Sequence, residues 1–117
     1  MYGYIFLNFR TKYLLHADND IYVISSRHNT NFVARAIQIL EHDPSCFAVR
    51  IPMCIEGGQQ RVTNFLSLRL FVTERKRAKK LFPVENYHQQ PESFIREKLE
   101  EINMRVTVLS SKEACYY

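Results

Sequence analysis

Residues 61–74, RVTNFLSLRLFVTE, are the longest strand-like run in the chain, and the predicted fold depends on them. Leucine or valine stands at every second position of Leu66–Val72, which predicts a strand with one side facing a core. The odd-numbered positions of Phe65–Thr73 would then point to the other side of the sheet. This strand therefore anchors the predicted architecture, and its outer side becomes a candidate binding surface.

The remaining elements follow from hydrophobic periodicity, turn residues and prolines. Residues 17–20, ADND, predict a turn that joins two strands in a hairpin. Asn29, Thr30 and Asn31 offer three possible N-caps for the first helix. Pro44 disfavours helical geometry in the residue before it, and Pro91 suits a first helical turn. The predicted elements are a strand at 2–9 that could continue to 16, strands at 21–25, 47–51 and 104–109, and helices at 32–43 and 91–102.

From residue 21 onward the order is strand, helix, strand, strand, helix, strand, which is the split βαβ pattern of ferredoxin-like domains. The sequence therefore predicts one α+β domain over residues 1–109. It would hold an antiparallel sheet with both helices on one face and an extra N-terminal strand. Residues 110–117 are expected to be a tail, although Tyr116 and Tyr117 could dock on the domain.

Composition limits the protein class. The chain has 117 residues, 46% hydrophobic and 24% charged, which is typical of one folded domain. Only three residues are glycine, so a glycine-rich phosphate loop is not expected. No signal peptide is visible, and no apolar run reaches the 18 or so residues of a membrane span. We therefore expect a protein of the nucleus or cytoplasm that has no membrane partner.

Cysteine and histidine positions give no sign of catalysis. Cys46, Cys54 and Cys115 are odd in number and unrelated in spacing, which favours reduced structural thiols over a disulfide framework or a zinc site. The four histidines form no HxH or HExxH pattern. Cys54 could be a nucleophile, but no base can be assigned to it. The sequence predicts a protein that is not an enzyme and needs no metal or cofactor.

Positive charge is concentrated in one short stretch. The formal net charge is +4, and residues 61–91 alone carry seven basic and two acidic side chains. Five of these basic residues lie within residues 75–80: Arg75, Lys76, Arg77, Lys79 and Lys80. Clustered lysine and arginine suit phosphates or acidic partners. The alternative is that this stretch has no binding role and is a solvated loop whose lysines keep an edge strand soluble.

The outer side of the predicted strand extends this candidate site. Arg69 and Phe71 stand at alternate positions, as basic and aromatic residues do on the sheets of RNA-binding domains, although Thr73 occupies the place of a second aromatic. This is an analogy of fold, and the alternative is that Phe65 and Phe71 are buried under another element or a second subunit. The predicted nucleic-acid site, for RNA or DNA, comprises Arg61, Arg69, Phe71, Arg75, Lys76, Arg77, Lys79 and Lys80.

A second hypothesis assigns the basic stretch to protein recognition. Lys76-Arg77-Ala78-Lys79 has the dense basic spacing of a nuclear-import signal, and the same charges could dock an acidic protein. The protein would then be an interaction or regulatory adaptor, and its size and composition would also suit a viral accessory factor. With 13% aromatic residues, a homodimer is compatible with either hypothesis.

Overall fold

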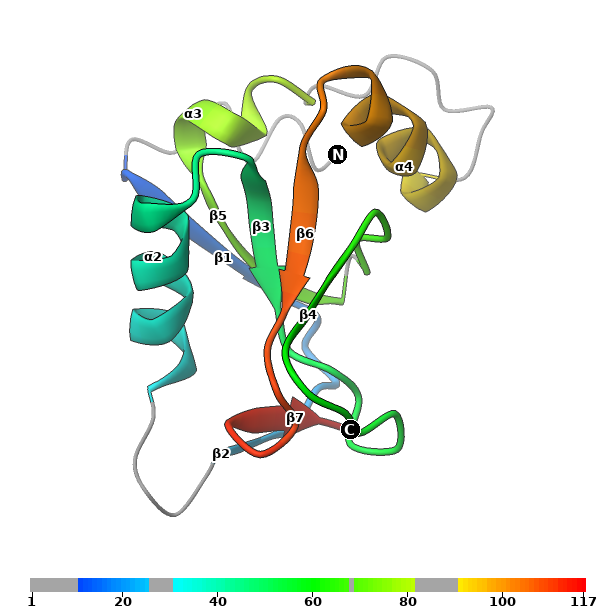
Figure 1. Cartoon of the computed structure of the whole chain (residues 1–117). Helices are drawn as coiled ribbons and strands as arrows, with labels where there is room; N and C mark the ends of the chain where they lie inside the picture. The colour runs from blue at the N-terminus through cyan, green and yellow to red at the C-terminus, as the bar shows by residue number, and fades with distance from the viewer. Residues whose placement is uncertain (1–10, 26–30, 68, 82–90) are drawn as a thin grey trace.

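A computed structural model describes residues 11–25, 31–67, 69–81 and 91–117. It is a mixed α+β fold with a five-stranded sheet in the order β1-β5-β3-β6-β4 (Figure 1). Only β3 and β6 are parallel, and the other neighbours are antiparallel. The strands are β1 (Tyr13–Ala17), β3 (Cys46–Arg50), β4 (Arg61–Thr63), β5 (Leu70–Glu74) and β6 (Arg105–Val108).

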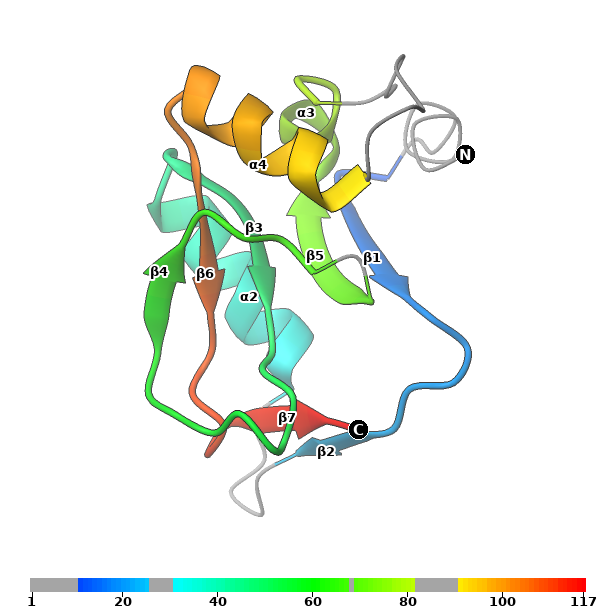
Figure 2. The same cartoon turned by 90° about the vertical axis from the view of Figure 1, so that its right-hand side faces the viewer.

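Helices cover both faces of this sheet. They are α2 (Phe32–His42), α3 (Arg75–Ala78) and α4 (Pro91–Glu101). Leu70 and Val72 pack with α2 in one core, whereas Phe71 between them packs with α4 and α3 in the other. In Figure 2 the helix α2 accordingly lies behind the sheet and α4 in front of it. The prediction of two helices on one face is therefore wrong, because both faces of the central strands are apolar.

Local signals set the helix boundaries. The side chain of Asn31 accepts hydrogen bonds from the N–H groups of Val33 and Ala34, which caps α2 as predicted. The helix ends at His42, before Pro44, and α4 begins at Pro91. Strand β6 confirms the strand expected at 104–109.

The predicted long strand at 61–74 is wrong. The chain forms β4, leaves the sheet, and returns as β5, which lies on the far side of β3 and β6 from β4. Two hydroxyls interrupt the extended backbone: Thr63 Oγ1 accepts the N–H of Phe65 at 3.2 Å, and Ser67 Oγ accepts the N–H of Arg69 at 3.4 Å. Such local side-chain bonds compete with strand pairing and favour turns.

Residues 21–25 do not join the main sheet either. Strand β2 (Val23–Ser25) pairs antiparallel with β7 (Ala114–Tyr116) in a separate two-stranded sheet. The predicted hairpin between β1 and β2 is absent among the described residues, and the split βαβ arrangement is not confirmed. The expected tail contains β7, in which Tyr116 is buried. The strand predicted at 2–9 lies outside the described residues.

A disulfide joins this small sheet to the loop after β3. Cys54 and Cys115 are bonded, with their Cα atoms 4.8 Å apart. The adjacent backbone is also paired, since Cys54 N–H donates to Tyr116 O and Tyr116 N–H donates to Pro52 O. The expectation of three reduced thiols is thus wrong for two of them. Cys46 alone is free, and it is buried.

Candidate nucleic-acid interface

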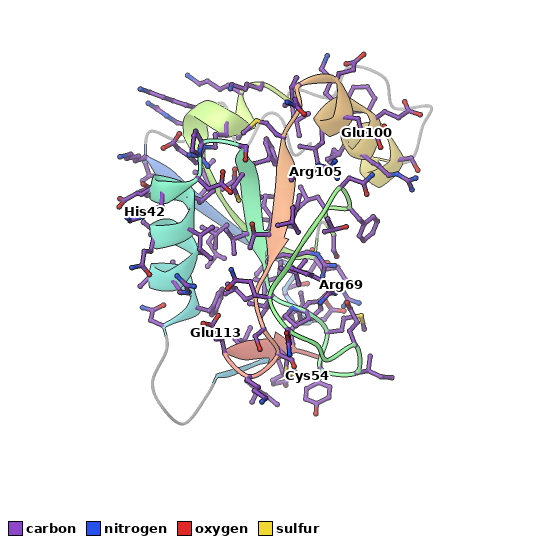
Figure 3. The ribbon with its side chains drawn as sticks, in the orientation of Figure 1. His42, Cys54, Arg69, Glu100, Arg105 and Glu113 are labelled. Carbon is purple, nitrogen blue, oxygen red and sulfur yellow. A yellow bond between two sulfur atoms is a disulfide. The ribbon has the colours of Figure 1, made fainter. Side chains whose placement is uncertain are left out.

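The basic stretch is a folded turn on the end of β5. Helix α3 starts directly after the strand, and the N–H of Leu81 continues the turn by donating to Ala78 O. Ala78 and Leu81 are buried three residues apart, so one side of the turn faces the core shared with α4. The three lysines of the stretch, Lys76, Lys79 and Lys80, are exposed on the other side. In Figure 3 side chains project from α3 away from the sheet.

Arg77 differs from its basic neighbours because its side chain is only 12% exposed. Its guanidinium donates to three backbone carbonyls, those of Leu40, Asp43 and Cys46. These carbonyls lie at the end of α2, in the following turn and at the start of β3. Leu40 O is one of the last carbonyls of α2, which the helix itself leaves without a partner, whereas Asp43 O also accepts the N–H of Cys46 at 3.1 Å. Arg77 also pairs with Glu74 at 3.5 Å. The structure therefore corrects the prediction that the Arg77 side chain faces a bound nucleic acid: it holds α2, the following turn and β3 together.

Lys12 joins the stretch from the start of β1. The N–H of Arg75 donates to Lys12 O at 2.8 Å, which holds the two segments together. Beside this contact lies a pocket of about 310 Å³ whose described lining residues are Lys12, Glu74, Arg75 and Lys76. The Lys12 ammonium is also 5.4 Å from the centre of the Tyr13 ring, within cation–π range. We call Lys12, Arg75, Lys76, Lys79 and Lys80 the α3 basic patch.

Among the described residues, the four lysines of the α3 basic patch form no salt bridge with a carboxylate. The nearest carboxylate in sequence is that of Glu74, which is partly buried and paired with Arg77. The carboxylate that lines the pocket together with Lys12 and Lys76 is therefore already paired. Such a patch raises the local concentration of anions and steers them to the surface.

Arg61 and Arg69 lie away from this patch and have acidic partners. Arg69 is at the opposite end of β5 from α3, about 20 Å along an extended chain, and Figure 3 labels it near the lower part of the molecule. It contacts Asp18 at 3.8 Å and Asp20 at 3.5 Å. Arg61 is on the edge strand β4 and pairs with Glu56 at 3.1 Å. The structure does not bring these two arginines to the basic patch.

Phe71 is unavailable for base stacking. Its side chain is fully buried in the core beneath α4, and the His16 ring lies 5.4 Å from it. The interpretation of the strand face as an RNA-binding surface is wrong at this residue, and the alternative of a buried ring is confirmed. Phe65 is 40% exposed, and the Arg50 guanidinium lies 5.9 Å from its ring.

Two of the chemical groups considered from the sequence, a metal-binding cluster and the Cys54 thiol, can be compared with the described residues. They contain no group of three or more His, Cys, Asp or Glu residues placed to hold a metal ion. Cys54, the nucleophile considered from sequence, is held in the disulfide. Burial raises the pKa of the Cys46 thiol, which favours the unreactive protonated form. None of the helices in the described part of the chain is long and apolar enough to cross a membrane.

Comparison of the chain with protein-family models, with curated proteins and with solved structures found no match. The site is therefore interpreted from its own geometry. Sequence reasoning located residues 75–80 correctly as a charged cluster, but it missed Lys12, which is 63 positions before Arg75 and carries no local signal. Only the pairing of β1 with β5 places Lys12 beside α3.

Proposed function

We propose that the protein binds nucleic acid without catalysis, through the α3 basic patch. The observation that carries the proposal is the convergence of two chain segments, at Lys12 and at residues 75–80, on one surface rich in exposed lysines. Lysine ammonium groups on flexible stems suit phosphates at variable positions, without a fixed recognition geometry. The proposed mechanism is neutralisation of phosphates with release of counterions, and it reads little sequence.

The fold of the basic stretch favours this mechanism over an import signal. A receptor that reads Lys76-Arg77-Ala78-Lys79 as a peptide needs access to its side chains. Ala78 is buried, and the Arg77 guanidinium donates hydrogen bonds to three backbone carbonyls. Reading them would require α3 to unfold, whereas phosphates can approach the exposed lysines with α3 intact.

The test is a titration of labelled single- and double-stranded RNA and DNA by fluorescence anisotropy, repeated over a series of salt concentrations. The variant is Lys76→Ala, Lys79→Ala and Lys80→Ala together, which leaves Arg77 and its bonds in place. We expect micromolar binding by the wild type at low salt, weakened by added salt. The slope of log K against log salt should fall by about 2–3 in the variant, because each phosphate contact contributes just under one.

A matched variant separates this site from net charge. Arg35→Ala, Lys98→Ala and Lys112→Ala together remove the same three charges elsewhere, two of them from residues that pair with Glu113 and Glu101. We expect this variant to keep the wild-type affinity and slope. Equal losses in both variants would show only an effect of overall charge. Negligible binding by the wild type would overturn the proposal and turn the search to acidic protein partners of an adaptor.

A further inference from the structure

Exposed apolar side chains gather at the end of the molecule that holds the β2–β7 sheet. Eight large hydrophobic residues of the described chain are exposed, and five of them lie on this sheet, beside it or in the loop bonded to it: Tyr22, Val23, Ile24, Ile55 and Tyr117. Figure 1 shows β2 and β7 at the opposite end of the molecule from α3 and α4. An apolar cluster of this kind marks an interaction surface, and it is separate from the α3 basic patch.

The outer edge of β2 has hydrogen-bonding groups available in a defined pattern. Tyr22 and Tyr117 exchange both main-chain hydrogen bonds, at 3.4 and 2.9 Å, and Val23 lies opposite Tyr116. Because the bonding direction alternates along an antiparallel strand, the main-chain groups of Tyr22 and Ile24 point to β7, and those of Val23 point away from it. Among the described strands, none pairs with this outer edge.

The edge of β2 also lacks the charged residues that protect other edges. The edge strands of the main sheet are β1 and β4. Each has a charged residue at its start: Lys12 directly precedes β1, and Arg61 is the first residue of β4. Charged residues at such positions discourage pairing with other chains. Residues 21–25, IYVIS, carry neither a charge nor a proline. An uncharged strand edge beside apolar side chains is suited to accept another strand.

We propose that β2 pairs antiparallel with β2 of a second copy of this chain, about a twofold axis at Val23. The two Val23 residues would then exchange their outward main-chain hydrogen bonds and form a four-stranded sheet in the order β7-β2-β2-β7. This register places Tyr22 against the partner's Ile24, and the pair occurs twice. Tyr22 is 77% and Ile24 49% exposed in the single chain, so both have area to bury. An aromatic side chain opposite a β-branched one is a favourable cross-strand pair.

The second copy is favoured over an unrelated strand because the surface is self-complementary. The twofold axis lies at an uncharged residue, so no like charges meet there, and each exposed residue faces a suitable partner. The basic patches would remain at the two far ends of the dimer, since α3 is at the other end of each copy (Figure 1).

The register is tested by sedimentation velocity over a range of protein concentrations. Wild type is expected to be dimeric. Tyr22→Lys with Ile24→Lys places lysine opposite lysine twice, and we expect dimerisation to weaken about a hundredfold. Tyr22→Lys with Ile24→Glu places lysine opposite glutamate, and this variant should remain dimeric but dissociate as salt is added.

The two variants change the same exposed positions, and thermal unfolding followed by circular dichroism establishes that both are folded. A wild type that stays monomeric at submillimolar concentration would overturn the proposal, and a strand from another protein would then be the occupant to seek. Dimers in both variants would place the interface elsewhere. Monomers in both would exclude this register and indicate association through apolar area alone.

Discussion

Replacing Arg77 with alanine is expected to lower the free energy of unfolding by about 3 kcal/mol. The guanidinium donates to carbonyls of three residues, Leu40, Asp43 and Cys46, at the junction of α2 and β3. These acceptors are in a partly buried region, so their loss of a charged donor is not fully replaced by water. The same substitution removes the partner of Glu74, whose side chain is only 18% exposed.

The measurement is urea-induced unfolding of the wild type, Arg77→Ala and Lys76→Ala. Lys76 is the adjacent basic residue and is exposed, so its replacement should change stability by less than about 0.5 kcal/mol. Arg77→Lys should lie between the two, because one ammonium cannot reproduce the planar arrangement of donors that reaches several carbonyls. Equal stabilities of Arg77→Ala and Lys76→Ala would contradict the structural role of Arg77.

This result also bears on how binding is tested. A variant that replaces all five basic residues of the stretch would remove Arg77 and destabilise the junction of α2 with β3. Loss of binding in such a variant would combine loss of charge with loss of structure. The three exposed lysines are therefore the informative set, and Arg77→Ala reports on stability.

The sequence predicted the locally encoded parts of the fold. Helix α2 has an asparagine cap and a proline after its end, and β6 alternates valine with polar residues, so both were found nearly in place. Residues 61–74 were predicted as one strand because alternating apolar residues are typical of a strand. The side-chain hydroxyls of Thr63 and Ser67 interrupt that strand by accepting hydrogen bonds from the backbone, and the alternation of residue types does not reveal such bonds. The partner of β2 is about 90 residues away in the sequence, a distance at which periodicity carries no information.

For the candidate site, composition located the charge but not the role of each charge. Five basic residues within residues 75–80 are alike in the sequence, and only the fold shows that Arg77 faces α2 while Lys76, Lys79 and Lys80 face solvent. The sequence placed Phe71 on the face opposite the helices and left open whether this face binds RNA or is buried under another element or a second subunit. The sheet is covered on both faces, so alternation along β5 separates two cores instead of core from solvent.

Replacing Cys54 and Cys115 together with serine is expected to lower the free energy of unfolding by about 2–4 kcal/mol. The bond closes a loop between residues 61 positions apart, and a cross-link over so long a segment strongly restricts the unfolded chain. Its removal should lower the melting temperature by roughly 10 °C in a domain of this size. Thermal unfolding of the two proteins, with and without reductant, is the measurement.

Reductant provides an internal control, because it should lower the melting temperature of the wild type to that of the double serine variant and leave the variant unchanged. Alkylation of the denatured, unreduced wild type should modify one thiol per chain, that of Cys46, which the structure shows as free. Three modified thiols, or a melting temperature that does not respond to reductant, would show that the bond does not form in solution.

Because the Cys54–Cys115 disulfide is expected to contribute this much stability, the free energy of unfolding should depend on whether the surroundings are oxidising or reducing. Where thiols are kept reduced, as in the cytosol and nucleus, Cys54 and Cys115 would be a dithiol and the chain would have the stability of the serine variant. Strand β7 would then be held by its pairing with β2, by the bonds from Tyr116 to Pro52 and Cys54, and by the burial of Tyr116. The α3 basic patch lies at the other end of the molecule (Figure 1), so reduction should weaken the β2–β7 sheet first and leave the lysines of α3 in place.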